Sequence, residues 1–332
     1  MNEIAAYHLL RKRQGLLALG LLLALLVLLL VSLDLGKVPL RWSDIPDTSS
    51  PSFHVLWDMR LPRLLAAIVG GAVLGVSGLI LQNVLGNPMA SPYTLGISGA
   101  AAFGAATAIL FFPHHGHGVV QGASFLASAL CIALVLAIAH WKSMSPSTLI
   151  LAGIMLNALF TAATHALQYF SDDQKAAEIL FWSFGDLNRA RLQDSLLLLG
   201  TFLVAFLWLA RQRWNFSLMS LGDEQAQAAG LSPARFRVLC LLVTAFFTSW
   251  VVSLVGTIAF AGLVVPHLAR LLIRDDGPWL LPATTLMGGL FLLVCVDISQ
   301  SLFQPVILPV GIVTAFCGAP FFLALLLTRP RN

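Results

Sequence analysis

Charged residues are scarce in this sequence, and their scarcity excludes an ordinary soluble protein. They make up 10% of the 332 residues, whereas apolar residues make up 58%. Soluble domains contain about 25% charged and about 45–50% apolar residues. The mean hydropathy is +0.87. A chain of this composition has lipid as its main solvent, so we predict an all-α polytopic membrane protein.

Sequence motifs for catalysis are also missing. The chain has no G-x-x-x-x-G-K-[ST], and therefore no P-loop for ATP. It has no G-x-S-x-G, no H-E-x-x-H, and no pair of carboxylates within its apolar segments. The four cysteines lie in apolar runs without a C-x-x-C pair, which argues against a disulfide framework and a thiolate metal site. We expect no catalytic residue, no metal and no cofactor in this chain.

Long apolar segments fill most of the sequence. At about 20 residues per span, they predict about ten transmembrane helices in one domain, residues 1–332. The first segment follows Arg11-Lys12-Arg13 and has no A-x-A cleavage site, so we expect it to be retained. The expected spans are 15–33, 63–85, 93–112, a fourth ending near 141, 149–170, a sixth ending near 210, 238–256, a short and broken eighth at 257–273, 279–302 and 309–327.

Small residues recur at four-residue spacing in two of these spans. They are Ala67, Gly71 and Gly75 in the second span, and Ala100, Gly104 and Ala108 in the third. Residues four apart share one helix face, and small side chains allow neighbouring helix backbones to approach closely. We expect both faces to be helix contacts.

The fifth span carries polar residues along one side. Asn157, Thr161, Thr164 and Gln168 follow one another at steps of four, three and four, which places them on one helix face. Because polar groups seldom face acyl chains, this stripe lies either against a neighbouring helix or along a wet pathway. We favour the pathway.

A polar, alanine-rich segment at about 220–233 separates the sixth and seventh spans. Asp223 and Glu224 suit the start of a short helix, Gly230 suits its left-handed end, and Ser232-Pro233 suits the start of the next helix. The segment is either an ordinary loop helix or a docking surface. A second polar segment, about 173–186, predicts a short helix outside the membrane.

The distribution of basic residues orients these spans. Starting from a cytoplasmic N-terminus, twelve of the 19 Lys and Arg residues fall inside and seven outside, in the direction of the positive-inside rule. Both termini and the segment 220–233 are then cytoplasmic.

A few ionisable residues invite a functional role. His165, His267 and Asp297 lie in expected spans, which keeps a haem-binding membrane enzyme and a proton-coupled carrier open as alternatives. Arg60 and Arg63 at the outer mouth of the second span are either carboxylate donors for a partner or a routine interfacial pair. The histidine-rich loop 114–117 has no carboxylate or cysteine beside it, and we expect it to be solvated.

Several motifs together resemble the FecCD-type permeases, the membrane subunits of ABC importers for iron–siderophores, haem and cobalamin. The matching segments follow one another from about residue 60 to 320. They are Arg60-Leu61-Pro62-Arg63, Asn87-Pro88-Met89-Ala90-Ser91-Pro92 with Leu95-Gly96-Ile97, Leu221-Gly222-Asp223 with Ala228 and Gly230, Phe260 through Arg270, and Leu308-Pro309-Val310-Gly311.

This resemblance implies a type II importer in a bacterial cytoplasmic (inner) membrane. Its partners would be a second permease, identical or paralogous, two P-loop ATPase subunits that bind ATP and Mg²⁺, and an extracytoplasmic substrate-binding protein. It implies no nucleic-acid partner. The expected substrate is an iron(III)–siderophore complex, with cobalamin or haem as alternatives, and the expected mechanism is alternating access.

The resemblance also implies roles for individual residues. Arg60 and Arg63 would contact acidic residues of the binding protein, whereas the third outer arginine of some relatives is missing after Asp297. Spans five and ten would line the pathway, and the linker 143–148 would form the inner gate. The implied coupling residues are Leu221, Gly222, Asp223, Glu224, Ala228 and Gly230; the pathway residues of span ten are Gly311, Thr314 and Gly318; the gate residues are Ser143, Ser145 and Thr148.

Overall fold

The computed structural model describes residues 3–36, 38–112, 116–142, 144–273, 277–303 and 306–328, and every regular element in them is a helix. The elements are α1 (Glu3–Asp34), η1 (Trp42–Asp44), α2 (Pro51–His54), η2 (Val55–Arg60), α3 (Leu61–Val84), α4 (Ile97–Phe111), α5 (His117–Lys142), α6 (Pro146–Tyr169), α7 (Asp173–Ser183), η3 (Leu187–Arg189), α8 (Leu192–Arg211), α9 (Arg213–Ser220), α10 (Asp223–Ala228), α11 (Pro233–Val255), α12 (Ala261–Ile273), α13 (Leu280–Ser301) and α14 (Val310–Thr328). The histidine-rich loop lies largely outside the described residues.

Within the described residues, seven helices are long and apolar enough to cross a membrane. Three shorter apolar helices, α4, α12 and Val310–Ala324 of α14, lie where the other three spans are expected. The predicted outer helix also forms, as α7, with Asp172 at its N-cap accepting a hydrogen bond from the Lys175 amide at 2.9 Å. The prediction of an all-helical membrane fold is confirmed.

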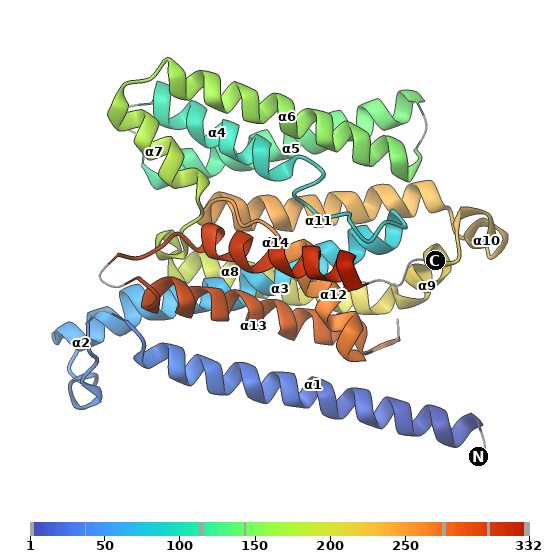
Figure 1. The fold of residues 1–332 in the computed structure, drawn as a ribbon, viewed down its shortest axis with the longest axis horizontal. Helices are drawn as coiled ribbons and strands as arrows, with labels where there is room; N and C mark the ends of the chain where they lie inside the picture. Colours follow the sequence, from blue (N-terminus) through green and yellow to red (C-terminus); the bar gives the residue numbers. More distant parts are fainter. Residues whose placement is uncertain are drawn as a thin grey trace.

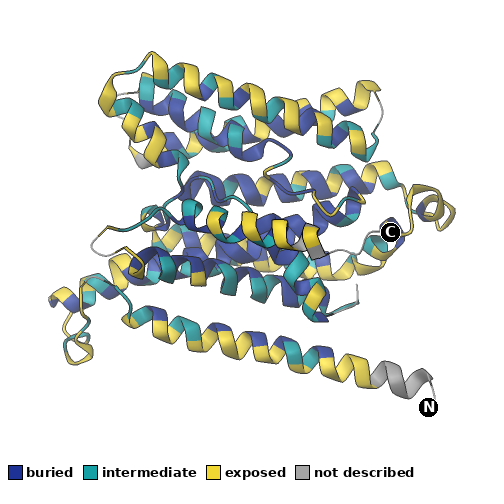
Figure 2. Cartoon of the chain, in the orientation of Figure 1, coloured by how far each residue is buried: buried dark blue, intermediate teal, exposed yellow. Residues whose placement is uncertain are grey.

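Helix α3 runs through the middle of the bundle and contacts α13, α12, α11 and α8 (Figure 1). In the apolar part of the span Pro51–Val84, which contains α3, 89% of the residues are buried. In the apolar part of α1 only 22% are buried. Helix α1 lies along the outside against α13 and is largely exposed (Figure 2). The helices α4, α5 and α6 form a separate group on the other side of α11 (Figure 1).

The small-residue face of α3 is a contact surface, as its spacing predicts. A Cβ added at Gly71 would overlap the Gly288 carbonyl of α13, and one added at Gly78 would overlap the Gly262 carbonyl of α12. The predicted close face of α4 is confirmed in the same way, because a Cβ at Gly104 would overlap the Ala123 carbonyl of α5. Backbones therefore touch at these crossings without intervening side chains.

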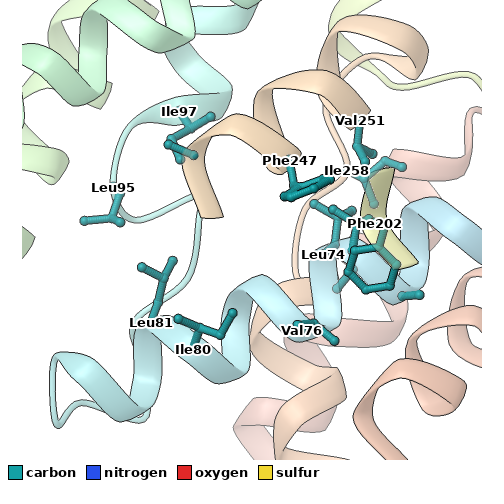
Figure 3. Close-up of a cluster of buried hydrophobic side chains, with 14 of the residues drawn as sticks. Leu74, Val76, Ile80, Leu81, Leu95, Ile97, Phe202, Phe247, Val251 and Ile258 are labelled. Carbon is teal, nitrogen blue, oxygen red and sulfur yellow. The ribbon is translucent and has the colours of Figure 1, made fainter. Parts of the chain in front are cut away.

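Larger side chains fill the core on the flank of α3 that faces α8 and α11. Phe202 of α8 and Phe247 of α11 pack edge to face, with ring centroids 5.9 Å apart, and lie near Leu74 of α3 (Figure 3). Val251 and Ile258 close the same cluster (Figure 3). The middle helix is therefore held by backbone contact on one side and by interdigitated side chains on the other.

The eighth span is broken, as predicted, and its first part is not helical. Residues 256–259 have no helical assignment, and α12 begins only at Ala261. Gly256 has φ +80°, and a Cβ there would overlap the Trp182 carbonyl. The Asp186 amide donates to the Val255 carbonyl at 2.7 Å, and the Thr257 hydroxyl donates to the Ser183 carbonyl at 2.5 Å. Non-helical backbone survives here because protein covers it.

The α3–α13 crossing gives a stability prediction. Gly71→Ala forces its methyl group into the Gly288 carbonyl, and we expect it to destabilise the fold by about 1–3 kcal/mol, as overpacking does. Gly200→Ala in α8 is the matched control, because a Cβ there meets nothing within 4 Å. Thermal unfolding in detergent should show a lower midpoint for Gly71→Ala alone. Equal midpoints for both variants would contradict the close crossing.

Candidate functional site

The segment between α9 and α11 forms a short exposed helix at one end of the bundle. Residues 221–230 are exposed except Ala226, which is fully buried and anchors α10 to the protein. The start of α1 and the end of α14 lie at the same end, whereas α2 and α7 lie at the opposite end (Figure 1). The predicted coupling residues therefore share one solvent-facing surface.

Helix α10 ends as its sequence predicts. Gly230 has φ +88°, its amide donates to the Gln227 carbonyl at 2.9 Å, and the Leu231 amide donates to the Ala226 carbonyl at 3.0 Å. This pair of bonds is a Schellman motif, which needs the left-handed conformation that glycine adopts most easily. Ser232 and Pro233 take the N-cap and first positions of α11, also as predicted.

The start of α10 differs from the prediction. Gly222, at φ +105°, occupies the N-cap position, and Asp223 is the first helical residue. The Asp223 carboxylate accepts a hydrogen bond from Arg237 of α11 at 2.8 Å instead of capping the helix. Sequence pattern does not single out Arg237, because Arg235 and Arg237 look alike in a polar stretch and only the structure shows that Arg237 is 2% exposed.

The predicted inner gate lies at the start of α6. Ser145 is the N-cap of α6, where its hydroxyl oxygen accepts from the Thr148 amide at 3.3 Å and lies 2.9 Å from the Thr148 hydroxyl. Ser143 lies outside the described residues. The two described gate residues thus stiffen the first turn of the helix.

The two outer arginines face inward. Arg60 donates to the carbonyls of Leu33 and Val38, so it caps the end of α1, and it is 2% exposed. Arg63 is 7% exposed and donates to the side-chain oxygen of Asn188 at 3.2 Å. Their docking role stays a prediction, and this burial counts against it.

Other groups near Arg63 are also tied to the protein. Asp297 of α13 accepts from the Ser32 hydroxyl of α1 at 2.7 Å, so this intramembrane carboxylate joins two helices. In the segment between α7 and α8, burial lowers the pKa of Arg189, and the nearby carboxylates of Asp186 and Glu178 oppose that shift. At this end of the bundle Arg63, Asn188 and Asp297 are therefore engaged in contacts within the chain.

The polar stripe of α6 lies beside α4. A Cβ at Gly99 of α4 would overlap the Asn157 amide oxygen, and Thr164 is buried with its hydroxyl donating to the Phe160 carbonyl at 2.9 Å. Thr161 and Gln168 are partly buried. This placement fits the helix-contact alternative at Asn157, and the pathway role of the four residues stays a prediction.

The predicted face of α14 is close-packed. A Cβ at Gly311 would overlap the Phe184 carbonyl, and one at Gly318 would overlap the Phe260 ring. Thr314 is fully buried and donates to the Gly311 carbonyl at 2.9 Å. The exposed side of α14 carries Phe316 and Leu323 instead. The three predicted pathway residues thus face their own chain, and their role as pathway lining stays a prediction.

The intramembrane histidines are not gathered with other metal ligands. Among the described residues, no group of three or more His, Cys, Asp and Glu side chains is placed to hold a metal ion. His267 of α12 lies against the rings of Phe321 and Phe322 of α14, with centroids 6.0 and 6.2 Å away. The His267 ring therefore contributes to an aromatic contact between two helices.

Comparison with known proteins decides the family. A model of the FecCD transport family matches residues 24–328. The chain belongs to this family. It is 37% identical over 328 residues to the hemin transport system permease protein HmuU of Yersinia pestis, covering 94% of this chain and 96% of that protein. It is 36% identical over 327 residues to the Fe(3+)-citrate import system permease protein YfmE of Bacillus subtilis, covering 97% and 98%.

A solved structure shares the whole fold. It is described as an inward-facing conformation of a transporter assigned to the metal-chelate ABC type, and it matches with a TM-score of 0.84 and 31% identity over 95% of this chain and 100% of that one. This FecCD protein is therefore a multi-pass permease subunit of an ABC importer with the type II permease fold.

Arg60 gives a prediction that separates its two possible roles. Arg60→Ala removes this donor from the Leu33 and Val38 carbonyls, and we expect the free energy of unfolding to fall by about 1.5–3 kcal/mol, as for loss of a hydrogen bond to a charged group. Thermal unfolding of the isolated permease should show a lower midpoint for Arg60→Ala. Arg191→Ala, at an exposed position, is the control and should keep the original midpoint. An unchanged midpoint together with weaker affinity for the binding protein would instead support docking.

Proposed function

We propose that this permease moves an iron(III)–siderophore complex into the cytoplasm by alternating access. The names of its relatives support an iron chelate, because they include permeases for Fe(3+)-citrate and hemin at 36% and 37% identity. Relatives for vitamin B12 at 34% and molybdate at 31% widen the range of possible cargo. Haem is the second candidate, favoured by the match to the hemin permease over nearly its full length.

The observation that carries the transport mechanism is the exposed helix α10. Within the part of the chain that the structure describes, every residue from 221 to 230 except Ala226 is exposed. A short helix that ends in a Schellman motif and exposes the small residues Ala228, Ala229 and Gly230 suits a groove on a partner. We propose that two P-loop ATPase subunits, which bind ATP and Mg²⁺, dock there and supply the force, with the contact made by Leu221, Gly222, Asp223, Glu224, Ala228 and Gly230.

The remaining partners follow from the same arrangement. We propose a bacterial cytoplasmic (inner) membrane in which α10 and both termini are cytoplasmic, supported by the excess of basic residues at that end. A substrate-binding protein would then dock at the outer end, where α2 and α7 lie (Figure 1). Arg60 and Arg63 would have to leave their internal partners to meet it.

The translocation path is proposed to lie between two permease subunits, identical or paralogous. Helices α6 and α14 are the proposed lining because both keep an exposed flank, which includes Met155 and Leu159 in α6 and Phe316 in α14. In this proposal Asn157, Thr161, Thr164 and Gln168 border the path, with Gly311, Thr314 and Gly318 on α14 and Ser145 and Thr148 at its inner gate.

The coupling role of α10 can be tested with one substitution. Ala228→Glu places a charge on the exposed docking face, and we expect ATPase activity of the assembled transporter to lose its stimulation by the binding protein. Ala228→Ser keeps a small, uncharged side chain at the same exposed position, and the stimulation by the binding protein should be unchanged in that variant. Full coupled transport by Ala228→Glu would contradict the assignment of α10 as the docking helix.

The cargo can be tested in proteoliposomes that contain the permease, its ATPase and its binding protein. We expect ATP-dependent uptake of an iron(III)–siderophore labelled with radioactive iron, and much less uptake of haem, cobalamin or molybdate. Preferred uptake of haem would select the second candidate. Uptake driven by a proton gradient without the ATPase would show that the protein is a secondary carrier and would contradict the proposed ATP-driven importer.

A further inference from the structure

A single buried side chain connects α10 to the helices of the membrane domain. Arg237 lies in the second turn of α11, and its guanidinium group bonds in three directions. Its Nε donates to the Val84 carbonyl at 2.8 Å, its Nη1 to the Met144 carbonyl at 3.0 Å, and its Nη2 to the Asp223 carboxylate at 2.8 Å. These acceptors belong to the end of α3, the segment just before α6, and the start of α10.

The contact with α3 holds one end of the link in place. Val84 is the last residue of α3, and the carbonyls of Leu81, Gln82 and Asn83 accept from amides of the following loop. A helix leaves its last four carbonyls without partners inside the helix. Arg237 satisfies the fourth of them, which fixes the guanidinium to the most buried helix of the bundle.

The contact with Met144 reaches the predicted gate. Met144 comes directly before Ser145, the N-cap that is bonded to the Thr148 amide and hydroxyl. Because this first turn is held by its own hydrogen bonds, we expect a displacement of the Met144 carbonyl to move the start of α6. Helix α6 continues for 24 residues from this point toward the outer end (Figure 1).

The contact with Asp223 reaches the proposed docking helix. The Asp223 side chain is 53% exposed and that of Arg237 is 3% exposed, so the ion pair joins the outer surface to the interior. An arginine suits this place because its planar guanidinium offers donors in several fixed directions, whereas lysine offers a single flexible point of charge. The link adds specific geometry to the Coulomb attraction.

We propose that Arg237 is the positioning residue that transmits movement of α10 to the inner gate at the start of α6. The proposal rests on the proposed role of α10 as the docking helix. When the ATPase shifts α10, the Asp223 carboxylate displaces the guanidinium group, which displaces the Met144 carbonyl. The fixed Val84 carbonyl acts as the pivot.

The test uses the complete transporter and compares Arg237→Gln with Arg235→Gln. Arg235 lies two residues away on the same helix and is exposed. We expect Arg237→Gln to lower substrate transported per ATP hydrolysed by about tenfold, a size typical of coupling between sites. Arg235→Gln should keep the ratio of the unmodified transporter. An unchanged ratio in Arg237→Gln would overturn the proposal.

A distance measurement separates transmission from simple destabilisation. Spin labels at the exposed positions Gln227 and Ser147, introduced as cysteines, report on α10 and on the start of α6. Three native cysteines are buried, so replacing Cys317 leaves labelling selective. In the unmodified transporter the intrachain distance should stay narrow with and without bound nucleotide, because the two segments move together. In Arg237→Gln it should broaden and depend on nucleotide, and no change would contradict the link.

A second variant covers the possibility that Arg237→Gln does not fold. Asp223→Asn keeps the bonds from Arg237 to Val84 and Met144 and weakens the bond from Arg237 to α10. We expect the same nucleotide-dependent distance with a normal unfolding midpoint. Distances that match the unmodified transporter in this variant would also overturn the proposal. The proposed function fails separately, if Ala228→Glu transports normally or if the unmodified transporter takes up no iron chelate.

Discussion

Close backbone contact along α3 is the constraint on which the rest of the structure depends. In lipid, apolar side chains gain little by leaving the solvent, so helices associate by packing and by internal hydrogen bonds. Glycines at positions 71 and 78 bring α13 and α12 onto α3 at distances that leave no room for a Cβ. The remaining helices then pack around this central group, with α1 outside and α4 to α6 on the far side of α11.

Helix ends impose the second requirement. Unpaired carbonyls at the end of a span need donors, and an arginine supplies several from one side chain. Arg60 does this for the end of α1, and Arg237 does it for the end of α3. The two arginines differ in their other hydrogen-bond acceptors. Of the two, Arg237 also donates to a carboxylate on an exposed helix, that of Asp223. Structural capping and mechanical linkage thus use the same chemistry.

Sequence patterns predicted the helices better than they predicted the directions of side chains. Hydropathy fixes each span because length and apolarity are local properties, and the glycine at 230 and Ser232-Pro233 fix helix ends locally as well. The inward turn of Arg60, the packing of Gly311 on Phe184 and the burial of Arg237 depend on which helices become neighbours. No spacing rule within one segment contains that information, so motif residues were predicted as exposed or pathway-lining groups.

The segment 220–233 shows how a sequence ambiguity is reduced by structure. A loop helix and a docking helix have the same caps and the same composition, so the sequence left both open. The structure adds that α10 has one buried anchor, Ala226, and one charged tether, Asp223, which leads into the interior. An ordinary loop helix needs only the anchor. The tether gives the buried guanidinium of Arg237 its carboxylate partner, which a charged group with 3% of its side chain exposed requires, and the same ion pair connects the start of α10 to the interior.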